Sequence, residues 1–344
     1  MRVLQAMAGA EHGGAEAFFV RLALALRRAR LEQKIVIRTD RARAAQLAAG
    51  GVEPLQVPFG GRLDFVTPWR LKRALREFAP DVVLTWMNRA SLMMPEPSGD
   101  RSFVHVGRLG GYYDLKYYGR CRHLIGNTED IVDYVVKQGW PPERVHYLPN
   151  FVAETKSSPA RRGEFFTPPD APLLLAMGRL HPNKGFDVLI EAVARLPDVY
   201  LWIAGEGPLR GELEERAHRL FVKPRVRFLG WRDDTPALLA ACDAFVCPSR
   251  HEPLGNVVIE AWAQGVPVIA TESQGPAALI RHGETGFLVP LDDALALARA
   301  IQKLFADRDR ARAIGKAGRA TFEQRFTEKI VVGRYLDFFR NVVG

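Results

Sequence analysis

The stretch that decides the fold is HEPLGNVVIEA, residues 251–261, in which two glutamates stand eight positions apart. A single helix over these residues would leave Glu252 and Glu260 ~80° apart in direction and ~12 Å apart along the axis, too far to share a site. The proline and the glycine between them disfavour a helix interior, whereas Asn256 is a good cap for a helix reading VVIEAWAQ. We therefore expect Glu252 on a loop and Glu260 about one turn into the helix that follows.

The segments on either side of this junction have the composition of buried strands. AFVC precedes it and VPVIAT follows it, and both are apolar runs bounded by turn residues. Strand-like and helical runs alternate in this way along most of the chain, which predicts parallel sheets with crossover helices. In such sheets ligands bind at the carboxyl ends of the strands, and a helix N-terminus offers free N–H groups to an anion.

The domain organisation follows from length and from one break in the pattern. A chain of 344 residues is longer than one usual core supports, and AETKSSPARRGEFFTPPD, residues 153–170, interrupts the alternation with proline, serine, glycine and charge. We predict an α/β fold with two doubly wound, Rossmann-like domains, residues 1–152 and 171–320, facing across a cleft. Residues 321–344 are predicted to form one amphipathic helix that crosses back to the first domain.

Charge and hydropathy limit the partners and the location. The net charge is +9, and residues 1–156 carry +7 of it, which favours an anionic partner such as a nucleic acid, an acidic membrane surface or a phosphorylated acceptor. No run approaches the ~18 apolar residues of a membrane-spanning helix, and the N-terminus does not read as a signal peptide. We expect a cytoplasmic protein, with peripheral attachment to the inner face of the cytoplasmic membrane as an option.

No metal site is expected from the sequence. Cys121, Cys242 and Cys247 form no CxxC pair and fit no zinc spacing, so they read as buried, reduced thiols. Residues 307–309, DRD, have the Asp-x-Asp spacing that can hold a cation, but they lie in a helical, charged stretch typical of a solvated face.

A second motif is GRLHPNKGFDVLIEA, residues 178–192, where Arg179 and Lys184 lie on a loop between a strand and a helix. Arginine offers a rigid fork for phosphate oxygens and lysine a mobile point charge. Taken alone, the pair could belong to an ordinary surface loop. Together with residues 251–261 it indicates an anion site.

These motifs carry a family resemblance. GRLHPNKGFDVLIEA, LWIAGEGPLRGELE, RVRFLGW, AFVCPSRHEPLGNVVIEAWAQGVPVIAT and GETGFLVP, in this order, resemble the C-terminal half of the family-4 retaining glycosyltransferases of GT-B architecture. The N-terminal half is similar more loosely, through MAGAEHGGAE, PDVVLTW, HLIGNT and VHYLPN. The resemblance implies a hexosyltransferase-type enzyme (EC 2.4) that moves a sugar from a nucleotide-diphosphate sugar to a saccharide or lipid-linked acceptor, without metal or other cofactor. The basic first domain favours an anionic, membrane-bound acceptor such as a lipopolysaccharide core.

The resemblance also implies roles for residues of the second domain. Glu252 would contact hydroxyls of the transferred sugar, and Glu260 would accept hydrogen bonds from the ribose of the donor. Arg179 and Lys184 would neutralise the diphosphate. Further donor contacts are implied for the helix-start amides and for the base-binding loop: Leu254, Gly255, Asn256 and Leu229.

In the first domain the resemblance implies fewer roles. Gly13 and Gly14 would allow close approach of the acceptor and of the donor, respectively, although a tight turn needing positive φ would explain them as well. His105, read as the end of a strand, would lie near the sugar, although packing is the commoner role of a lone histidine. Tyr112 and Tyr113 are candidates for the acceptor side, because tyrosine offers flat faces and hydroxyls to sugar rings.

One basic amphipathic segment leaves two interpretations open. WRLKRALREF, residues 69–78, can lie on anionic lipid, or its apolar side can be the buried face of a crossover helix.

The mechanism and the rival functions also remain open at this stage. No carboxylate nucleophile of the kind found in retaining glycosidases is identified. The resemblance implies instead a same-face substitution, in which the departing phosphate oxygen helps deprotonate the acceptor hydroxyl. The alternatives are a GT-B-like epimerase or phosphorylase, an oxidoreductase suggested by GEGPLRG at residues 205–211, and a nucleic-acid-binding protein, for which no recognition motif is present.

Overall fold

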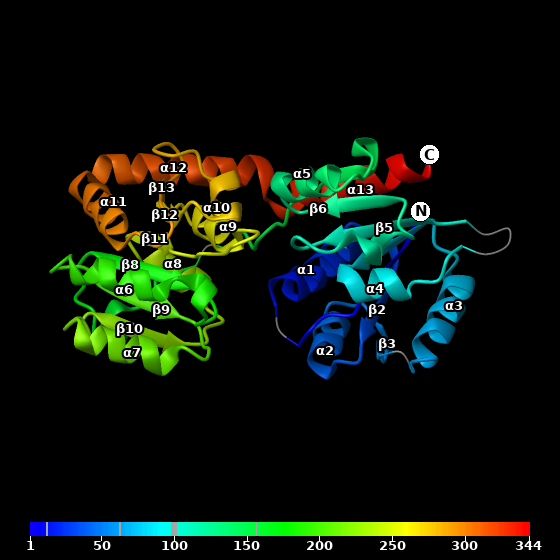
Figure 1. Ribbon diagram of the computed structural model, residues 1–344, viewed down its shortest axis with the longest axis horizontal. Coiled ribbons are helices and arrows are strands. Elements are labelled where there is room, and N and C mark those ends of the chain that lie inside the picture. Colours follow the sequence, from blue (N-terminus) through cyan, green and yellow to red (C-terminus); the bar gives the residue numbers. More distant parts are fainter. Residues whose placement is uncertain (12, 62, 98–101, 156) are drawn as a thin grey trace. The chain divides into compact units, whose positions relative to one another are not determined.

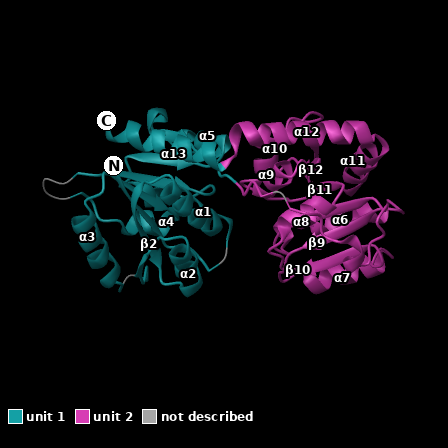
Figure 2. Cartoon of the chain, turned by 180° about the vertical axis from the view of Figure 1, so that it is seen from behind, with its two compact units in different colours: residues 1–151, 328–344 teal, residues 152–327 magenta. Residues whose placement is uncertain are grey.

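The computed structural model describes residues 1–11, 13–61, 63–97, 102–155 and 157–344. Two compact units divide the chain (Figure 2): unit 1 comprises Met1–Phe151 and Glu328–Gly344, and unit 2 comprises Val152–Thr327. Each unit is built around its own parallel sheet. The predicted pair of doubly wound α/β domains is thereby confirmed.

Unit 1 holds a seven-stranded sheet in the order β3-β2-β1-β4-β5-β6-β7 (Figure 1). Its strands are β1 (Arg2–Met7), β2 (Glu32–Arg38), β3 (Leu55–Val57), β4 (Val82–Trp86), β5 (Val104–Leu109), β6 (His123–Gly126) and β7 (Val145–Tyr147). Its helices are α1 (Gly14–Arg28), α2 (Arg41–Ala49), α3 (Val66–Phe78), α4 (Met87–Met93), α5 (Glu129–Lys137) and α13 (Glu328–Val343). The strand order reverses between β1 and β4, which makes this the switch point of the sheet.

Unit 2 holds a six-stranded sheet in the order β10-β9-β8-β11-β12-β13. Its strands are β8 (Leu173–Met177), β9 (Tyr200–Ala204), β10 (Val226–Gly230), β11 (Ala244–Cys247), β12 (Val268–Thr271) and β13 (Phe287–Val289). Its helices are α6 (Phe186–Ala194), α7 (Arg210–Arg219), α8 (Thr235–Ala241), α9 (Asn256–Ala263), α10 (Gln274–Leu279), α11 (Ala294–Ala306) and α12 (Arg308–Arg325). Here the switch point lies between β8 and β11.

Both sheets are buried on two faces, as the apolar runs in their strands predict. In β1, Val3 and Met7 pack with α1 and α13, while Leu4 and Ala6 pack on the other face with α3 and α4. In β8 the side chains divide between two clusters in the same alternating way. This two-residue period decides which side chains of a strand face the helices on either side of the sheet.

The C-terminal segment differs from the single helix expected over residues 321–344. Helix α12 ends at Arg325 and α13 begins at Glu328. The aromatic side chains of α13, Tyr335, Phe338 and Phe339, are buried in the core of unit 1 together with α1. Arg28 of α1 holds the start of α13 through a bidentate ion pair with Glu328, at 2.7 Å.

None of the helices in the described part of the chain is long and apolar enough to cross a membrane.

A glycine at the edge of unit 2 gives a test of the fold. Gly205, after β9, has φ +146°, and a Cβ atom there would lie 1.9 Å from the carbonyl oxygen of Gly178. We expect Gly205→Ala to lower the free energy of unfolding of unit 2 by about 2 kcal/mol or more, measured by denaturant titration. Gly211→Ala is the matched control, because nothing lies within 4 Å of the added Cβ. Equal stability of the two variants would contradict the close approach of the two loops.

Candidate active site

The site in unit 2 begins with two loops that leave neighbouring strands at the switch point. Residues 178–185 follow β8 and residues 248–255 follow β11, and these two strands pair in parallel. Gly185 allows the loops to meet, because its φ is +62° and a Cβ atom would lie 2.1 Å from the carbonyl oxygen of Pro248. The amide of His251 donates to the carbonyl of Asn183 at 3.1 Å. The loops therefore form one structure at the carboxyl edge of the sheet.

Lys184 and Glu252 form an ion pair where the two loops meet. The ammonium of Lys184, at the end of a short 3-10 turn (Pro182–Lys184), donates to Oε2 of Glu252. The side chain of Glu252 is only 11% exposed, and the amide of Gly275 donates to its backbone carbonyl at 2.7 Å. A carboxylate this well buried needs a cation beside it. The structure thus brings together two of the predicted site residues that are 68 positions apart in the chain.

Helix α9 begins at Asn256, shortly after Glu252 in the chain. Gly255 is its N-cap with φ +68°, so the predicted cap, Asn256, is instead the first helical residue. The correction has a simple cause: only glycine adopts this left-handed conformation cheaply. Glu260 lies one turn further on and is half-buried, and Leu254 lies on the loop before the helix, as expected.

The first helical turn of α9 differs from that of α1 in its acidic residues. The first turn of α9 contains no acidic residue. In unit 1, by contrast, the first turn of α1 contains Glu16, whose Oε1 accepts a hydrogen bond from the amide of Ala10 at 2.8 Å. An anion at the start of α1 would meet the carboxylate of Glu16, whereas the carboxylate nearest in the chain to the start of α9, Glu252, is paired with Lys184. This difference favours unit 2 as the place for a phosphate.

Arg179 and Leu229 occupy different positions in unit 2. Arg179 is exposed directly after β8, and it makes no hydrogen bond or ion pair with any residue that the structure describes. Leu229 lies within β10, at the edge of the sheet, and is partly buried. The exposed indole of Trp231 follows it and donates to Asp233 at 3.0 Å. Nothing in these contacts assigns a nucleobase to this loop.

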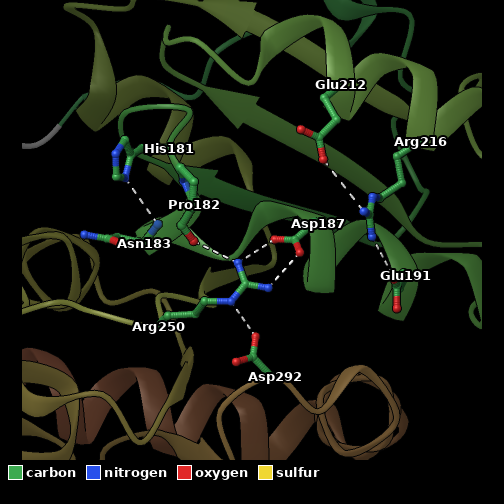
Figure 3. Close-up of polar contacts among 9 residues, drawn as sticks. All are labelled: His181, Pro182, Asn183, Asp187, Glu191, Glu212, Arg216, Arg250 and Asp292. Carbon is green, nitrogen blue, oxygen red and sulfur yellow. Dashed lines mark hydrogen bonds and ion pairs between the residues drawn. The ribbon is translucent and has the colours of Figure 1, made fainter.

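Arg250 is a site residue that sequence reasoning missed. Figure 3 shows its guanidinium facing Asp187 in a bidentate pair at 2.8 and 2.7 Å, with Asp292 at 2.5 Å. It also donates to the carbonyl of Pro182 at 2.8 Å, in the turn that carries Lys184. Burial alone would raise the pKa of Asp187, but the hydrogen bonds and charge of Arg250 hold it below its ordinary value. Arg250 therefore ties the turn with Lys184 to the loop with Glu252.

The sequence contains only a weak signal for the pairing of Arg250 with Asp187. Asp187 follows GRLHPNKGF and Arg250 precedes HEPLGN, so each lies next to a motif that the sequence singled out. Their pairing is set by the neighbouring strands β8 and β11. Without the strand order, either residue looks like an ordinary surface charge.

At the carboxyl edge of unit 1, Gly13 and Gly14 lie at the start of α1. Gly13 is the N-cap with an extended φ of 171°, and Gly14 is the first helical residue. Neither has the positive φ of the tight-turn alternative. A Cβ atom on Gly13 would lie 2.2 Å from Oε2 of Glu16. The contacts predicted for Gly13 and Gly14 remain predictions, and the neighbouring carboxylate favours sugar hydroxyls over phosphate at this turn.

Tyr112 and Tyr113 lie on the loop after β5, at the same edge of the sheet. The hydroxyl of Tyr112 donates to Asp130 of α5, and Tyr134 of α5 donates to the carbonyl of Tyr113 at 3.0 Å. The rings of Tyr112 and Tyr134 meet edge to face, 5.3 Å apart. These contacts fasten the loop to α5 and leave both tyrosines partly exposed.

His105 is not at a strand end, which corrects the sequence interpretation. It is the second residue of β5, close to the amino end of the strand. The side chain is 4% exposed and contacts Thr85 at 2.9 Å and the carbonyl of Arg120 at 3.1 Å. Burial lowers its pKa from 6.5 to about 4. His105 is therefore a packed core residue. The sequence interpretation of SFVHVG ended the strand too early, since β5 continues to Leu109.

Among the residues that the structure describes, no group of three or more His, Cys, Asp and Glu side chains could hold a metal ion. Asp307 caps α12 by accepting from the amide of Arg310 at 2.9 Å, and Asp309 pairs with Arg312 at 3.4 Å. The DRD sequence is thus used for a helix start.

Two doubly wound units, each with its switch point at the carboxyl edge of a parallel sheet, have the architecture of the GT-B fold. The chain matches the profile of the family "Glycosyltransferase Family 4" over residues 12–156 and that of "Glycosyl transferases group 1" over residues 158–321. The chain therefore belongs to the glycosyltransferases that these two profiles describe, and it has the GT-B fold.

Three relatives illustrate the likeness. The chain is 40% identical to the lipopolysaccharide core biosynthesis glycosyltransferase LpsE of Rhizobium meliloti (strain 1021), over 94% of this chain and 95% of that protein. It is 38% identical to LpsD of the same organism, over 98% of both chains. Among solved structures, Anabaena HepE in complex with UDP and glucose aligns with a TM-score of 0.85 and 23% identity, over 99% of this chain and 100% of that one.

The contacts of Arg250 with Asp187 and with the carbonyl of Pro182 give a test of the site. We expect Arg250→Met to lower kcat about tenfold with a smaller effect on donor KM, because Lys184 is no longer held in place. Asp187→Asn should have a similar effect, and the double variant should be no worse than either single one.

Arg216→Met is the matched control for this test. Arg216 makes ion pairs with Glu191 at 2.5 Å and Glu212 at 3.8 Å in the same unit (Figure 3), without touching either loop of the site. Steady-state kinetics with kcat unchanged in Arg250→Met, or equally reduced in Arg216→Met, would contradict the positioning role.

The buried His105 predicts a pH dependence of stability. Its folded pKa of about 4 lies below the ordinary 6.5, so the unfolded chain takes up the proton first. The stability it contributes is intact above pH 6.5 and is lost as the pH falls toward 4. Between pH 7 and 5 the loss should be about 2 kcal/mol, and His105→Asn should flatten this part of the profile. Denaturant titrations at both pH values measure it, and an unchanged slope in the variant would refute the assignment.

Proposed function

We propose that this glycosyltransferase moves a sugar, with retention of configuration, from a nucleotide-diphosphate sugar to a saccharide of a lipid-linked or lipopolysaccharide core acceptor. The observation that carries the proposal is the Lys184–Glu252 pair on the loops before α9, with Arg179 exposed on the same loop as Lys184. Further support for the acceptor class comes from LpsE and LpsD, both named lipopolysaccharide core biosynthesis glycosyltransferases.

The diphosphate end of the donor is assigned to Arg179, Lys184 and the start of α9. The ammonium of Lys184 can donate three hydrogen bonds and donates one to Glu252, so two remain for phosphate oxygens. Negative charge that develops on the leaving diphosphate then meets donors that are already in place, which lowers the barrier. The amides at Leu254, Gly255 and Asn256 complete this set.

Glu252 is assigned to the hydroxyls of the transferred sugar and Glu260 to the ribose. An ionised carboxylate only accepts hydrogen bonds, which suits the hydroxyl donors of a sugar. Because the buried Glu252 is already paired with Lys184, we do not assign it as nucleophile or general base. The bond from the anomeric carbon to phosphate breaks as the bond to the acceptor oxygen forms on the same face, and the departing phosphate oxygen takes the acceptor proton.

The acceptor is assigned to the edge of unit 1 that carries Gly13, Tyr112 and Tyr113. We further propose that the enzyme works without a metal ion, at an anionic membrane surface in the cytoplasm. The basic charge of residues 1–156 supports the last point.

A thermal-shift screen over UDP, GDP, ADP and CMP sugars identifies the donor, and product analysis by NMR then tests the reaction. We expect an α-linked product from an α-linked donor, undiminished by EDTA. An epimerised nucleotide sugar, or a sugar phosphate as product, would establish the epimerase or the phosphorylase instead.

Two substitutions separate the assigned roles. Glu260→Ala should weaken donor binding by about tenfold to a hundredfold, because it removes hydrogen bonds to a charged group. Lys184→Ala should chiefly lower kcat, by about a hundredfold, since its charge acts on the leaving group. Isothermal titration with the nucleoside diphosphate and steady-state rates measure the two effects. Wild-type binding and turnover in both variants would refute the assignments.

A further inference from the structure

Arg43 of α2 is a buried cation that holds a loop from another part of unit 1. Its side chain is only 4% exposed. Its Nη2 atom donates to the backbone carbonyl of Ala10 and, at 3.2 Å, to that of Glu11. Both carbonyls belong to the segment between β1 and α1, of which residues 8–11 and 13 are described, and we call these residues the β1 loop. Arg43 therefore joins α2 to a loop that lies 33 positions earlier in the chain.

The β1 loop is held from a second helix by Glu16 of α1. Oε1 of Glu16 accepts from the amide of Ala10 at 2.8 Å, so both backbone groups of Ala10 are bound by charged side chains. A Cβ atom added to Gly9 would lie 2.7 Å from Cγ of Glu16, which shows how closely this side chain packs against the loop. One cation and one carboxylate, from two different helices, thus fix the loop at a single residue.

Asp40 orients the guanidinium of Arg43. It is the N-cap of α2, where Oδ1 accepts from the amide of Arg43 at 3.0 Å and Oδ2 lies 3.1 Å from Nη2. The amide of Asp40 donates in turn to Oε1 of Gln56, in β3, at 3.2 Å. A chain of contacts therefore runs from β3 through Asp40 and Arg43 to Ala10.

This arrangement is unfavourable for stability at one atom. Nη1 of Arg43 is buried, and no residue that the structure describes accepts a hydrogen bond from it. A buried donor without a partner destabilises a fold, and replacing a buried ion pair by uncharged groups of similar volume is often neutral or stabilising. The arginine is therefore explained better by the loop that it holds than by the packing of the core.

The β1 loop leads to the part of unit 1 to which the acceptor is assigned. It ends at Gly13, the N-cap of α1. A Cβ atom on Gly110 would lie 3.8 Å from Cβ of Ala15, so the loop after β5, which carries Tyr113, borders the start of α1. Burial raises the pKa of Tyr113, and the charge of Glu16 raises it further. A displacement of the β1 loop would therefore move groups on the acceptor side.

We propose that Arg43 is a positioning residue of the transfer reaction, which holds the β1 loop in the shape that binds the acceptor. The inference rests on the proposed function, because the acceptor side of unit 1 is taken from it. Arg43 acts through the loop and not on the reacting atoms. The diphosphate contacts are assigned to unit 2, so donor binding does not depend on Arg43.

The double variant Asp40→Ser with Arg43→Met tests the proposal without leaving a buried charge unpaired, since serine still caps α2. We expect acceptor KM to rise about tenfold, with donor KM and nucleoside diphosphate affinity unchanged. The variant should unfold at the wild-type temperature or above, which a merely structural role would not allow. Arg43→Lys keeps the charge beside Asp40 but lacks the rigid fork, so its acceptor KM should be intermediate.

Arg73→Met is the matched control, because it removes an exposed pair with Glu77 on α3, and it should leave both KM values as in the wild type. Hydrogen exchange tests the positioning independently of the reaction. Amides of the β1 loop should exchange about tenfold faster in the double variant, while those of α9 in unit 2 keep their wild-type rates.

Two results would overturn the proposal. One is wild-type exchange of the β1 loop in the double variant, and the other is an acceptor KM that does not rise, or that rises only together with donor KM and a lower unfolding temperature. A wild-type protein that transfers no sugar would refute the proposed function instead, and the exchange rates would still decide whether Arg43 holds the loop.

Discussion

The ion pair between Lys184 and Glu252 is the interaction on which the site depends. A carboxylate with so little exposure is stable beside a cation and costly without one, by about 3–5 kcal/mol for a buried pair. This constraint explains the surrounding structure. Gly185 lets one loop approach Pro248, Gly275 holds the backbone of Glu252, and Arg250 ties the two loops together. Each of these contacts serves to keep one charge next to another.

The two switch points resemble each other in topology and differ in charge. Both lie where the strand order reverses, and both are followed by a helix whose first turn points N–H groups to the sheet edge. Glu16 places a carboxylate at the start of α1, whereas α9 has no acidic residue in its first turn. The two helix starts therefore differ in charge: Glu16 lies at α1, and the Lys184–Glu252 pair lies on the loops before α9.

The surface of unit 1 shows the opposite treatment of apolar groups. Its core buries Phe18, Phe19 and Trp86 completely, while Phe65 and Trp69 stay exposed a short distance along the chain. Burial of an aromatic side chain is worth about 1.5–3 kcal/mol, so a segment that keeps two of them in water forgoes that stabilisation.

The sequence by itself determined the fold class, the strand and helix alternation and the two motifs of the second unit whose residues Lys184 and Glu252 meet. It could do so because a two-residue period, helix caps and glycine positions are local properties of the chain. It misplaced His105 and missed Arg250, Glu16 and the exposure of Leu63 and Phe65. Those features depend on which strand lies beside which, and on whether a side chain faces core or solvent, and no spacing within a single segment encodes either. Only the tertiary structure brings Asp187, Arg250 and Asp292 together, because the strand order puts loops from distant parts of the chain at one edge of a sheet.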